Sequence, residues 1–328
     1  MLTISFDARW LGAHGIGRYA AEVSKRCAMQ ALLISGKPLG LWDPIRLGRA
    51  LARQKPDHFF SPGFNAPLGS PCPFSLTIHD LIHLDVPEER AWVKYGFYHG
   101  VVRPALTHAA CVFTVSEHSR QRIAEWSGVD ERKIIVAGNG VAAHFSPDGN
   151  VWPHARPYLL YVGNHKPHKN VGGMVQAFAD SGLAREFDLV MSGHIGRSLA
   201  VLAGQLGVLD EVRGLGFVEE ADLPSVYRGA AALVMPSRYE GFGLPLVEAM
   251  ACGTPVLSSN RTSLPEIGGD AVYYFDPDDE ESFVEGLRAL RDDAIRSALR
   301  ARGLERARLY DWDRVAERIR DGIGFGRV

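Results

Sequence analysis

The chain has 328 residues, 46% of them hydrophobic and 23% charged, and its 36 Lys and Arg against 38 Asp and Glu give a formal net charge of −2. This composition is typical of a globular protein long enough for two domains, and the near-neutral charge argues against a nucleic-acid-binding protein. No run approaches the roughly 18 apolar residues of a membrane-spanning helix. The start, MLTISFDARW, has no basic segment before an apolar run, so no signal peptide is expected.

The four cysteines, Cys27, Cys72, Cys111 and Cys252, show no paired spacing for a metal or redox site. Three of them lie in apolar stretches, which predicts buried, reduced thiols. The protein is therefore expected in the cytoplasm, and peripheral attachment to the inner face of the membrane stays open.

In the first half of the chain, short apolar runs alternate with helix-length stretches, which predicts a parallel sheet covered by helices on both faces. A helix is expected over Gly17–Met29, and the stretch from Ala31 to Pro56 has room for one strand and one helix. The other expected strands are Leu2–Asp7, His58–Ser61, Ser75–His79, Cys111–Val115 and Ile134–Ala137.

Residues 90–103 mix aromatic and basic side chains. Gly96 and Gly100 weaken the segment as a helix. It is interpreted as a core-packing surface, with a face for a lipid-linked acceptor as the alternative.

The segment PDGNVWPHARP, residues 147–157, is rich in Pro and Gly and predicts a linker between two domains, residues 1–149 and 150–310. The alternation then resumes, with helices expected over Val171–Ser181, Glu281–Leu290 and Trp312–Gly322. The fold class is therefore α/β, with two Rossmann-like, doubly wound parallel-sheet domains. The expected strands are Tyr158–Gly163, Asp188–Ser192, Val212–Phe217, Ala232–Pro236, Pro255–Ser258 and Val272–Phe275.

The segment EGFGLPLVE places Glu240 and Glu248 around a glycine-broken loop that opens into a helix near Pro245. Gly241 and Gly243 let the backbone approach a ligand closely, and free N–H groups at a helix start attract anions. A retaining sugar transferase needs such an arrangement, with one acid near the donor sugar, one near its ribose, and amides aimed at phosphate between them.

Residues 235–279, MPSRYEGFGLPLVEAMACGTPVLSSNRTSLPEIGGDAVYYFDPDD, resemble the carboxyl-terminal signature of glycosyltransferase family 4. The resemblance implies a GT-B fold, in which two Rossmann-like domains face a central cleft, and retaining transfer from a nucleotide sugar. It also implies that a terminal helix, residues 311–328, packs back on the first domain.

By this resemblance Glu240 holds hydroxyls of the donor sugar and acts in catalysis, and Glu248 binds the ribose. The main-chain amides of Phe242, Gly243 and Leu244 would lie near the sugar and the phosphates.

Lys169 matches the family's lysine against the donor diphosphate. Many members carry arginine directly after the glycine of the preceding strand, where this chain has Asn164, so Lys166 or Arg197 is expected to supply the missing charge; the alternative is that Arg197 is a solvated surface residue. A lysine and helix N-termini, each worth about half a charge, would stabilise the departing diphosphate.

Phe217 and Val218 fall at the family's base-contacting strand end, where main-chain atoms read the base. Two Asp-x-Asp sequences, which could bind a metal ion, occur at residues 276–278 and 311–313. The first is interpreted as a turn and the second as a helix cap. No metal and no cofactor is expected beyond the nucleotide sugar as co-substrate.

The first domain offers GAHGIGR, residues 12–18, whose GxxGxG pattern differs from the dinucleotide fingerprint. It resembles the family's glycine-rich loop, with Gly15 and Gly17 near the donor diphosphate and Arg18 toward the acceptor; the alternative is a tight turn before a packed helix.

His79 matches the family's histidine that reaches the donor sugar, since an imidazole can hydrogen-bond a sugar hydroxyl at neutral pH. Asp80 would orient His79 or touch the acceptor. A metal pair of His79 and His83 would need a helix where the sequence predicts a strand, so His83 is interpreted as structural.

The favoured function is α-retaining transfer of a hexose or deoxyhexose to a glycan or lipid-linked acceptor hydroxyl. The stretch SLPEIGGDA is similar to members that use GDP-mannose, which makes mannose the expected sugar, with UDP-sugars and dTDP-rhamnose as alternative donors. A sugar-nucleotide epimerase and a catalytically silent binding subunit remain as other functions.

Overall fold

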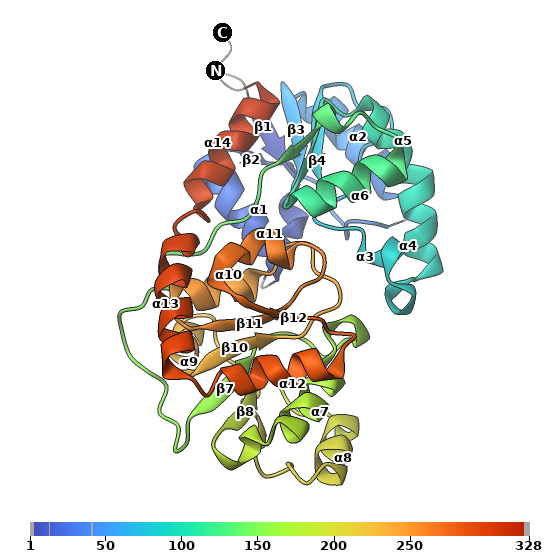
Figure 1. Ribbon diagram of the computed structural model, residues 1–328. Coiled ribbons are helices and arrows are strands. Elements are labelled where there is room, and N and C mark those ends of the chain that lie inside the picture. Colours follow the sequence, from blue (N-terminus) through green and yellow to red (C-terminus); the bar gives the residue numbers. More distant parts are fainter. Residues whose placement is uncertain (1–2, 13, 41, 325–328) are drawn as a thin grey trace. The chain divides into compact units, whose positions relative to one another are not determined.

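The computed structural model describes residues 3–12, 14–40 and 42–324 (Figure 1). The chain divides into two compact units, Met1–Gly140 with Asp311–Val328, and Val141–Tyr310. Each unit contains one six-stranded sheet in which every neighbouring pair of strands is parallel. Among the described residues, no helix combines the length and apolar character that crossing a membrane requires.

The sheet of the first unit has the order β2-β1-β3-β4-β5-β6. Its strands are buried along their whole lengths at the centre of the sheet, as expected for strands covered on both faces. The strands are Ile4–Phe6 (β1), Gln30–Ala31 (β2), His58–Ser61 (β3), Phe74–Thr77 (β4), Cys111–Thr114 (β5) and Ile134–Val136 (β6).

The helices of the first unit lie between these strands in the chain, except the terminal helix, which follows the second unit. They are Gly15–Arg26 (α1), Asp43–Gln54 (α2), Ile82–Asp85 (α3), Trp92–Phe97 (α4), Arg103–His108 (α5), Glu117–Ser127 (α6) and Trp312–Ile323 (α14). Short 3₁₀ helices cover Ala8–Trp10 (η1), Pro87–Glu89 (η2) and Glu131–Lys133 (η4), and a π-helix, Tyr98–Val102 (η3), joins α4 to α5.

The terminal helix α14 belongs to the first unit because its apolar face packs there, beside α1 (Figure 1). Trp312 and Ile319 share one buried cluster with Tyr19 of α1 and Phe113 of β5. Asp311 caps the helix by accepting a hydrogen bond from the amide of Asp313 at 2.9 Å, so the Asp-x-Asp sequence at residues 311–313 is a helix cap, as expected. Of the expected terminal segment, residues 325–328 lie outside the described residues.

The sheet of the second unit has the order β12-β11-β10-β7-β8-β9. The strands are Tyr158–Tyr161 (β7), Asp188–Met191 (β8), Val212–Gly214 (β9), Ala232–Met235 (β10), Val256–Ser259 (β11) and Tyr273–Phe275 (β12). The helices are Val171–Ser181 (α7), Arg197–Gln205 (α8), Leu223–Gly229 (α9), Leu244–Ala251 (α10), Leu264–Gly268 (α11), Glu280–Ala289 (α12) and Asp293–Ala307 (α13), with turns Pro167–Lys169 (η5), Leu183–Arg185 (η6) and Gly269–Ala271 (η7).

The predicted α/β class with two parallel sheets is confirmed, and each expected strand overlaps a strand of the structure. Leu2, the expected start of the first strand, lies outside the described residues. Several strands end earlier than expected: β4 ends at Thr77 rather than His79, so His79 lies in the loop that follows. The four cysteines are free, three of them buried and Cys72 half-buried.

Two expectations about helices were wrong. The first helix begins at Gly15 rather than Gly17, because His14 caps it, so both glycines lie in its first turn. Residues 92–108 are helical throughout, because the core packing of Tyr98 and Val102, which are 1% and 0% exposed, outweighs the low helix propensity of Gly96 and Gly100.

Candidate active site

The predicted site residues follow the carboxyl ends of parallel strands, where ligands bind in doubly wound sheets. In the second unit Lys169 follows β7 and Glu240 follows β10, and in the first unit His79 and Asp80 follow β4. The two groups lie in separate units and are described in turn.

Lys169 and Glu240 form an ion pair, with 2.6 Å between Nζ and Oε1. The two side chains are 18% and 13% exposed, so the pair is mostly shielded but reachable. The Glu240 backbone is fixed on both sides: its amide donates to Thr262 Oγ1 at 3.0 Å, and its carbonyl accepts from Ser263 Oγ at 3.0 Å. The loops after β7, β10 and β11 thus meet at one acid.

The loop that carries Lys169 is held by polar contacts near its start. The amide of Gly163 donates to Ser192 Oγ at 3.0 Å, and the Tyr161 hydroxyl donates to the carbonyl of Asn164. Burial, together with the negative charge of Glu240, raises the pKa of Tyr161 well above its usual value, so the hydroxyl stays a donor. The Asn164 side chain accepts from the amide of Lys166 at 3.2 Å and therefore shapes the loop.

The segment after Glu240 turns sharply into α10. Gly243 precedes the helix with φ of +100°, a conformation that favours glycine, and a Cβ there would lie 2.8 Å from Leu264 Cδ2, so any larger residue would also displace that side chain. No side chain caps the helix at Gly243. Phe242 is buried and packs edge-on against Tyr310, with 5.6 Å between ring centres. The amides at Gly243 and Leu244 thus begin an uncapped helix, an arrangement suited to an anion.

Glu248 lies in α10 and is only 4% exposed. The Tyr227 hydroxyl donates to its Oε2 at 2.9 Å, which joins α9 to α10 inside the second unit. The structure therefore gives this acid a structural partner that the sequence did not indicate.

Arg197, Phe217 and Val218 lie beyond the ends of β8 and β9. Arg197 is exposed at the first position of α8. The two strand ends are tied together by reciprocal hydrogen bonds of 2.8 and 3.0 Å between Gly193 and Gly216. Phe217, directly after this bridge, is 81% exposed, an unusual exposure for a phenylalanine.

In the first unit His79 is held by its neighbours. Its Nε2 lies 2.9 Å from the carbonyl oxygen of Pro62, which assigns the ring proton to Nε2. Its own carbonyl accepts from Ser119 Oγ at 3.1 Å, and the Tyr19 ring packs edge-on at 4.8 Å. Burial lowers the pKa of His79 below its usual value of 6.5, outweighing the opposite effect of the Pro62 hydrogen bond. The ring is thus neutral near pH 7, and Nδ1 is an acceptor.

Asp80 and His83 have local structural partners. Asp80 Oδ1 accepts from the amide of Ile82 at 3.1 Å, at the start of α3. His83 Nδ1 lies 3.2 Å from the carbonyl of Glu89, and Nε2 lies 3.0 Å from Lys94 Nζ. No cluster of three or more His, Cys, Asp or Glu side chains that could hold a metal ion occurs within residues 3–12, 14–40 and 42–324.

The glycine-rich segment closes tightly at the start of α1. His14 Nδ1 accepts from the amide of Gly17 at 3.0 Å, and a Cβ at Gly17 would lie 2.1 Å from the carbonyl oxygen of Gly12. Gly17 is therefore needed for the turn itself, as in the tight-turn alternative. Arg18 is half-buried in the same first turn.

A cavity of about 700 Å³ lies elsewhere in the first unit, between α2, the β3–β4 loop and the η3–α5 segment. None of the predicted site residues lines it. Its lining residues include Pro44, Leu68, Cys72, Val101 and His108.

Sequence reasoning missed the groups that hold the site residues in place. Thr262 and Ser263 lie in the loop after β11, so the rule that ligands gather at strand ends could have indicated them. Pro62 contributes a main-chain carbonyl, for which residue type gives no signal.

Residues 144–308 match the family model "Glycosyl transferases group 1". Residues 13–145 match a second model, "Glycosyltransferase Family 4". The O-antigen chain mannosyltransferase B of Escherichia coli is 32% identical over 72% of this chain and 66% of its own length. The serotype-specific mannosyltransferase WbdA of Escherichia coli is 26% identical over 66% of this chain and 29% of its own length. The matched region thus spans less than two thirds of either relative.

Among solved structures, the Anabaena protein HepE in complex with UDP-glucose is similar in fold, with a TM-score of 0.79 at 15% identity over 99% of this chain and 100% of that one. The two six-stranded parallel sheets and this similarity in fold place the protein in the α/β GT-B class. The chain belongs to the group 1 glycosyltransferases and is a family 4 glycosyltransferase similar to mannosyltransferases.

Proposed function

We propose that the protein transfers mannose from GDP-mannose to a hydroxyl of a glycan or lipid-linked acceptor, forming an α-linkage with retention. The Lys169–Glu240 pair, at the carboxyl end of the second sheet and just before the uncapped α10, is the observation that carries the proposal. The relatives named as mannosyltransferases support the choice of sugar.

In the second unit the donor diphosphate would face Lys169 and the amides of Phe242, Gly243 and Leu244. Asn164, where many members have arginine, adds no charge, so Lys169 would carry most of the cationic stabilisation, with Arg197 as the second cation. Glu240, released from Lys169 by the arriving phosphates, would accept hydrogen bonds from hydroxyls of the sugar.

Glu248, whose Oε2 accepts from the Tyr227 hydroxyl, would bind the ribose, and the main chain at Phe217 and Val218 would meet the base. In the first unit, neutral His79 would accept a hydrogen bond from a sugar hydroxyl through Nδ1. Asp80 and Arg18 would face the acceptor, and Gly15 and Gly17 would approach the donor diphosphate.

The chemical step follows from these groups. The bond between the anomeric carbon and the diphosphate oxygen breaks as the acceptor oxygen attacks the same face of the sugar. The acceptor's proton passes to the departing phosphate, and the negative charge that develops there is stabilised by Lys169 and the α10 amides. No metal is required in this scheme.

A thermal-shift panel of GDP-mannose, UDP-glucose and dTDP-rhamnose tests the proposal. A ligand at about 100 times its dissociation constant adds about 2.7 kcal/mol to stability, which corresponds to a shift of several degrees. We expect GDP-mannose alone to raise the melting temperature, and Lys169→Ala to abolish the shift. A response to UDP-glucose or dTDP-rhamnose instead would show that the donor is that nucleotide sugar and not GDP-mannose. A response to none of the three would favour a catalytically silent subunit.

A further inference from the structure

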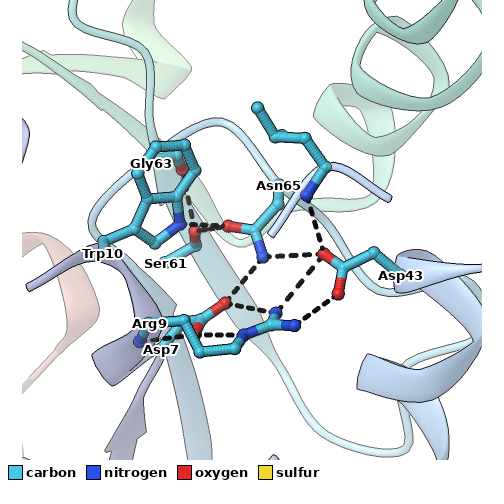
Figure 2. A network of polar contacts seen from close by, with 8 residues as sticks. Asp7, Arg9, Trp10, Asp43, Ser61, Gly63 and Asn65 are labelled. Carbon is cyan, nitrogen blue, oxygen red and sulfur yellow. Dashed lines mark hydrogen bonds and ion pairs between the residues drawn. The ribbon is translucent and has the colours of Figure 1, made fainter. Parts of the chain in front are cut away.

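A buried polar network lies at the carboxyl ends of β1 and β3 in the first unit (Figure 2). Arg9 lies between two carboxylates: Nε and Nη2 donate to Asp7 at 2.8 and 2.6 Å, and Nη1 donates to Asp43 at 2.5 Å. Asp7 and Asp43 are 0% and 1% exposed. Buried charges of this kind need their partners, because an unpaired carboxylate in the interior is strongly unfavourable.

Asn65 completes this network and uses its whole side-chain amide to do so (Figure 2). Its Nδ2 donates to Asp7 at 2.7 Å and to Asp43 at 3.3 Å. Its Oδ1 accepts from the indole Nε1 of Trp10 at 2.7 Å and lies 2.5 Å from Ser61 Oγ. The amide orientation is therefore fixed, since a flip would place its NH₂ against the indole donor and its oxygen against two carboxylates.

The short stretch from Ser61 to Asn65 is held along its length by these contacts. The Ser61 hydroxyl lies 2.8 Å from the carbonyl of Gly63, and that carbonyl also accepts from the amide of Thr77 at 3.3 Å. A Cβ at Gly63 would lie 2.4 Å from the Trp10 ring, so this backbone packs directly on the indole. Pro62 lies inside this fixed stretch, and its carbonyl is the one that contacts His79 Nε2 at 2.9 Å.

We propose that Asn65 is a positioning residue that presents the Pro62 carbonyl to His79 and so selects the ring tautomer with the proton on Nε2. The ionic groups Asp7, Arg9 and Asp43 anchor Asn65, and Trp10 fixes its amide. The consequence is a single acceptor, Nδ1, for a sugar hydroxyl. The inference rests on the proposed function for one point, that His79 binds a sugar. The tautomer itself is a property of the protein without any ligand.

Nitrogen-15 NMR of histidine-labelled protein tests this directly, with His79→Gln used to assign the His79 signals. In the wild-type protein we expect the Nε2–H tautomer alone at pH 7.5. In Asn65→Ser the carbonyl is no longer held, so both tautomers are expected and kcat/KM falls by about ten-fold or more, as for small misplacements of a reacting group. Trp10→Phe, which keeps an aromatic ring on Gly63 but removes the indole donor, is expected to act in the same direction.

Ser75→Ala is the matched control. Ser75 lies in β4 and is buried, as Asn65 is, but its hydroxyl contacts His58 at 2.9 Å and not the Ser61–Asn65 stretch. It should leave the His79 tautomer unchanged. If Trp10→Phe and Asn65→Ser lower stability or activity while His79 keeps the single Nε2–H tautomer, the network is structural only and the proposal is wrong. Should Asn65→Ser fail to fold, the Trp10→Phe spectrum decides.

Failure of the proposed function has a different signature. If His79→Gln transfers sugar at the wild-type rate, His79 takes no part in transfer. The tautomer of the wild-type and Asn65→Ser proteins still confirms or overturns the positioning role, since it is read without substrate.

Discussion

The candidate donor site and the His79 site hold their polar groups by different means. In the second unit, opposite charges on Lys169 and Glu240 neutralise one another at 2.6 Å. In the first unit a neutral imidazole is held by a main-chain carbonyl at 2.9 Å. A charged pair can exchange its partners for a charged ligand, whereas a ring fixed by backbone offers one acceptor in one direction. The first arrangement suits phosphate and the second suits a hydroxyl.

Glu240→Gln tests the role of the charged Lys169–Glu240 pair and should produce the largest loss of activity. Removing the carboxylate takes away the acceptor for sugar hydroxyls, and we expect kcat/KM for sugar transfer to fall by at least roughly 10²-fold. Steady-state kinetics with GDP-mannose measures it. Glu281→Gln, an exposed acid in the first turn of α12, is the control and should change nothing. Near wild-type activity in Glu240→Gln would remove Glu240 from the donor site.

Tyr227→Phe sharpens the contrast between the two acids of the Glu240–Glu248 segment. Glu248 would lose the hydroxyl that satisfies Oε2 in the interior, so the free energy of unfolding should fall by about 1–3 kcal/mol. Urea unfolding measures this, and Tyr95→Phe, on the half-buried side chain of α4, provides the comparison. An unchanged midpoint in Tyr227→Phe would mean that this hydrogen bond contributes nothing to stability.

His79→Gln tests the role of the neutral imidazole in the first unit, and it should lower activity less than Glu240→Gln does. A glutamine keeps a neutral acceptor but loses the fixed ring geometry, so we expect roughly a ten-fold loss of kcat/KM. In the wild-type protein burial lowers the pKa of His79 below its usual value of 6.5, so the neutral ring predominates at pH 6.5 and above, and activity that depends on it falls as the pH drops through the lowered pKa. The pH profile of His79→Gln should lack this acidic limb, and a limb that persists would belong to another group.

EDTA should have the smallest effect. Since Lys169 and the α10 amides are proposed to stabilise the departing diphosphate, chelation should leave the transfer rate and the ligand-induced thermal shift unchanged. Activity that falls with EDTA and returns with Mg²⁺ would show that the charge balance proposed for the second unit is incomplete.

Sequence patterns predicted the sheets well, because buried parallel strands are continuous apolar runs that end where loops begin. The same patterns predicted that Lys169 and Glu240 follow strand ends, and the structure brings them into contact. The contacts between individual side chains could not be predicted from the sequence in this way. The burial of Glu248 against Tyr227 and the contact of His79 with Pro62 depend on tertiary packing and on a main-chain atom, which no residue type specifies.

The glycine positions show the same limit. The sequence allows Gly17 to belong either to a ligand-binding loop or to a tight turn, and the structure requires glycine there for the turn, because any Cβ would collide with Gly12. A glycine pattern by itself does not distinguish close approach of a ligand from close approach of the chain to itself.

Calorimetric titration of GDP and GDP-mannose into the wild-type protein and Glu240→Gln tests the central claim most directly. The account predicts that the wild-type protein binds GDP-mannose more tightly than GDP, since only the sugar nucleotide reaches Glu240. Glu240→Gln should lose about ten-fold or more of the GDP-mannose affinity, as for a hydrogen bond to a charged group. Its GDP affinity should be maintained or improved, because Lys169 is freed. Equal losses for both ligands, or none for either, would contradict a donor site built on the Lys169–Glu240 pair.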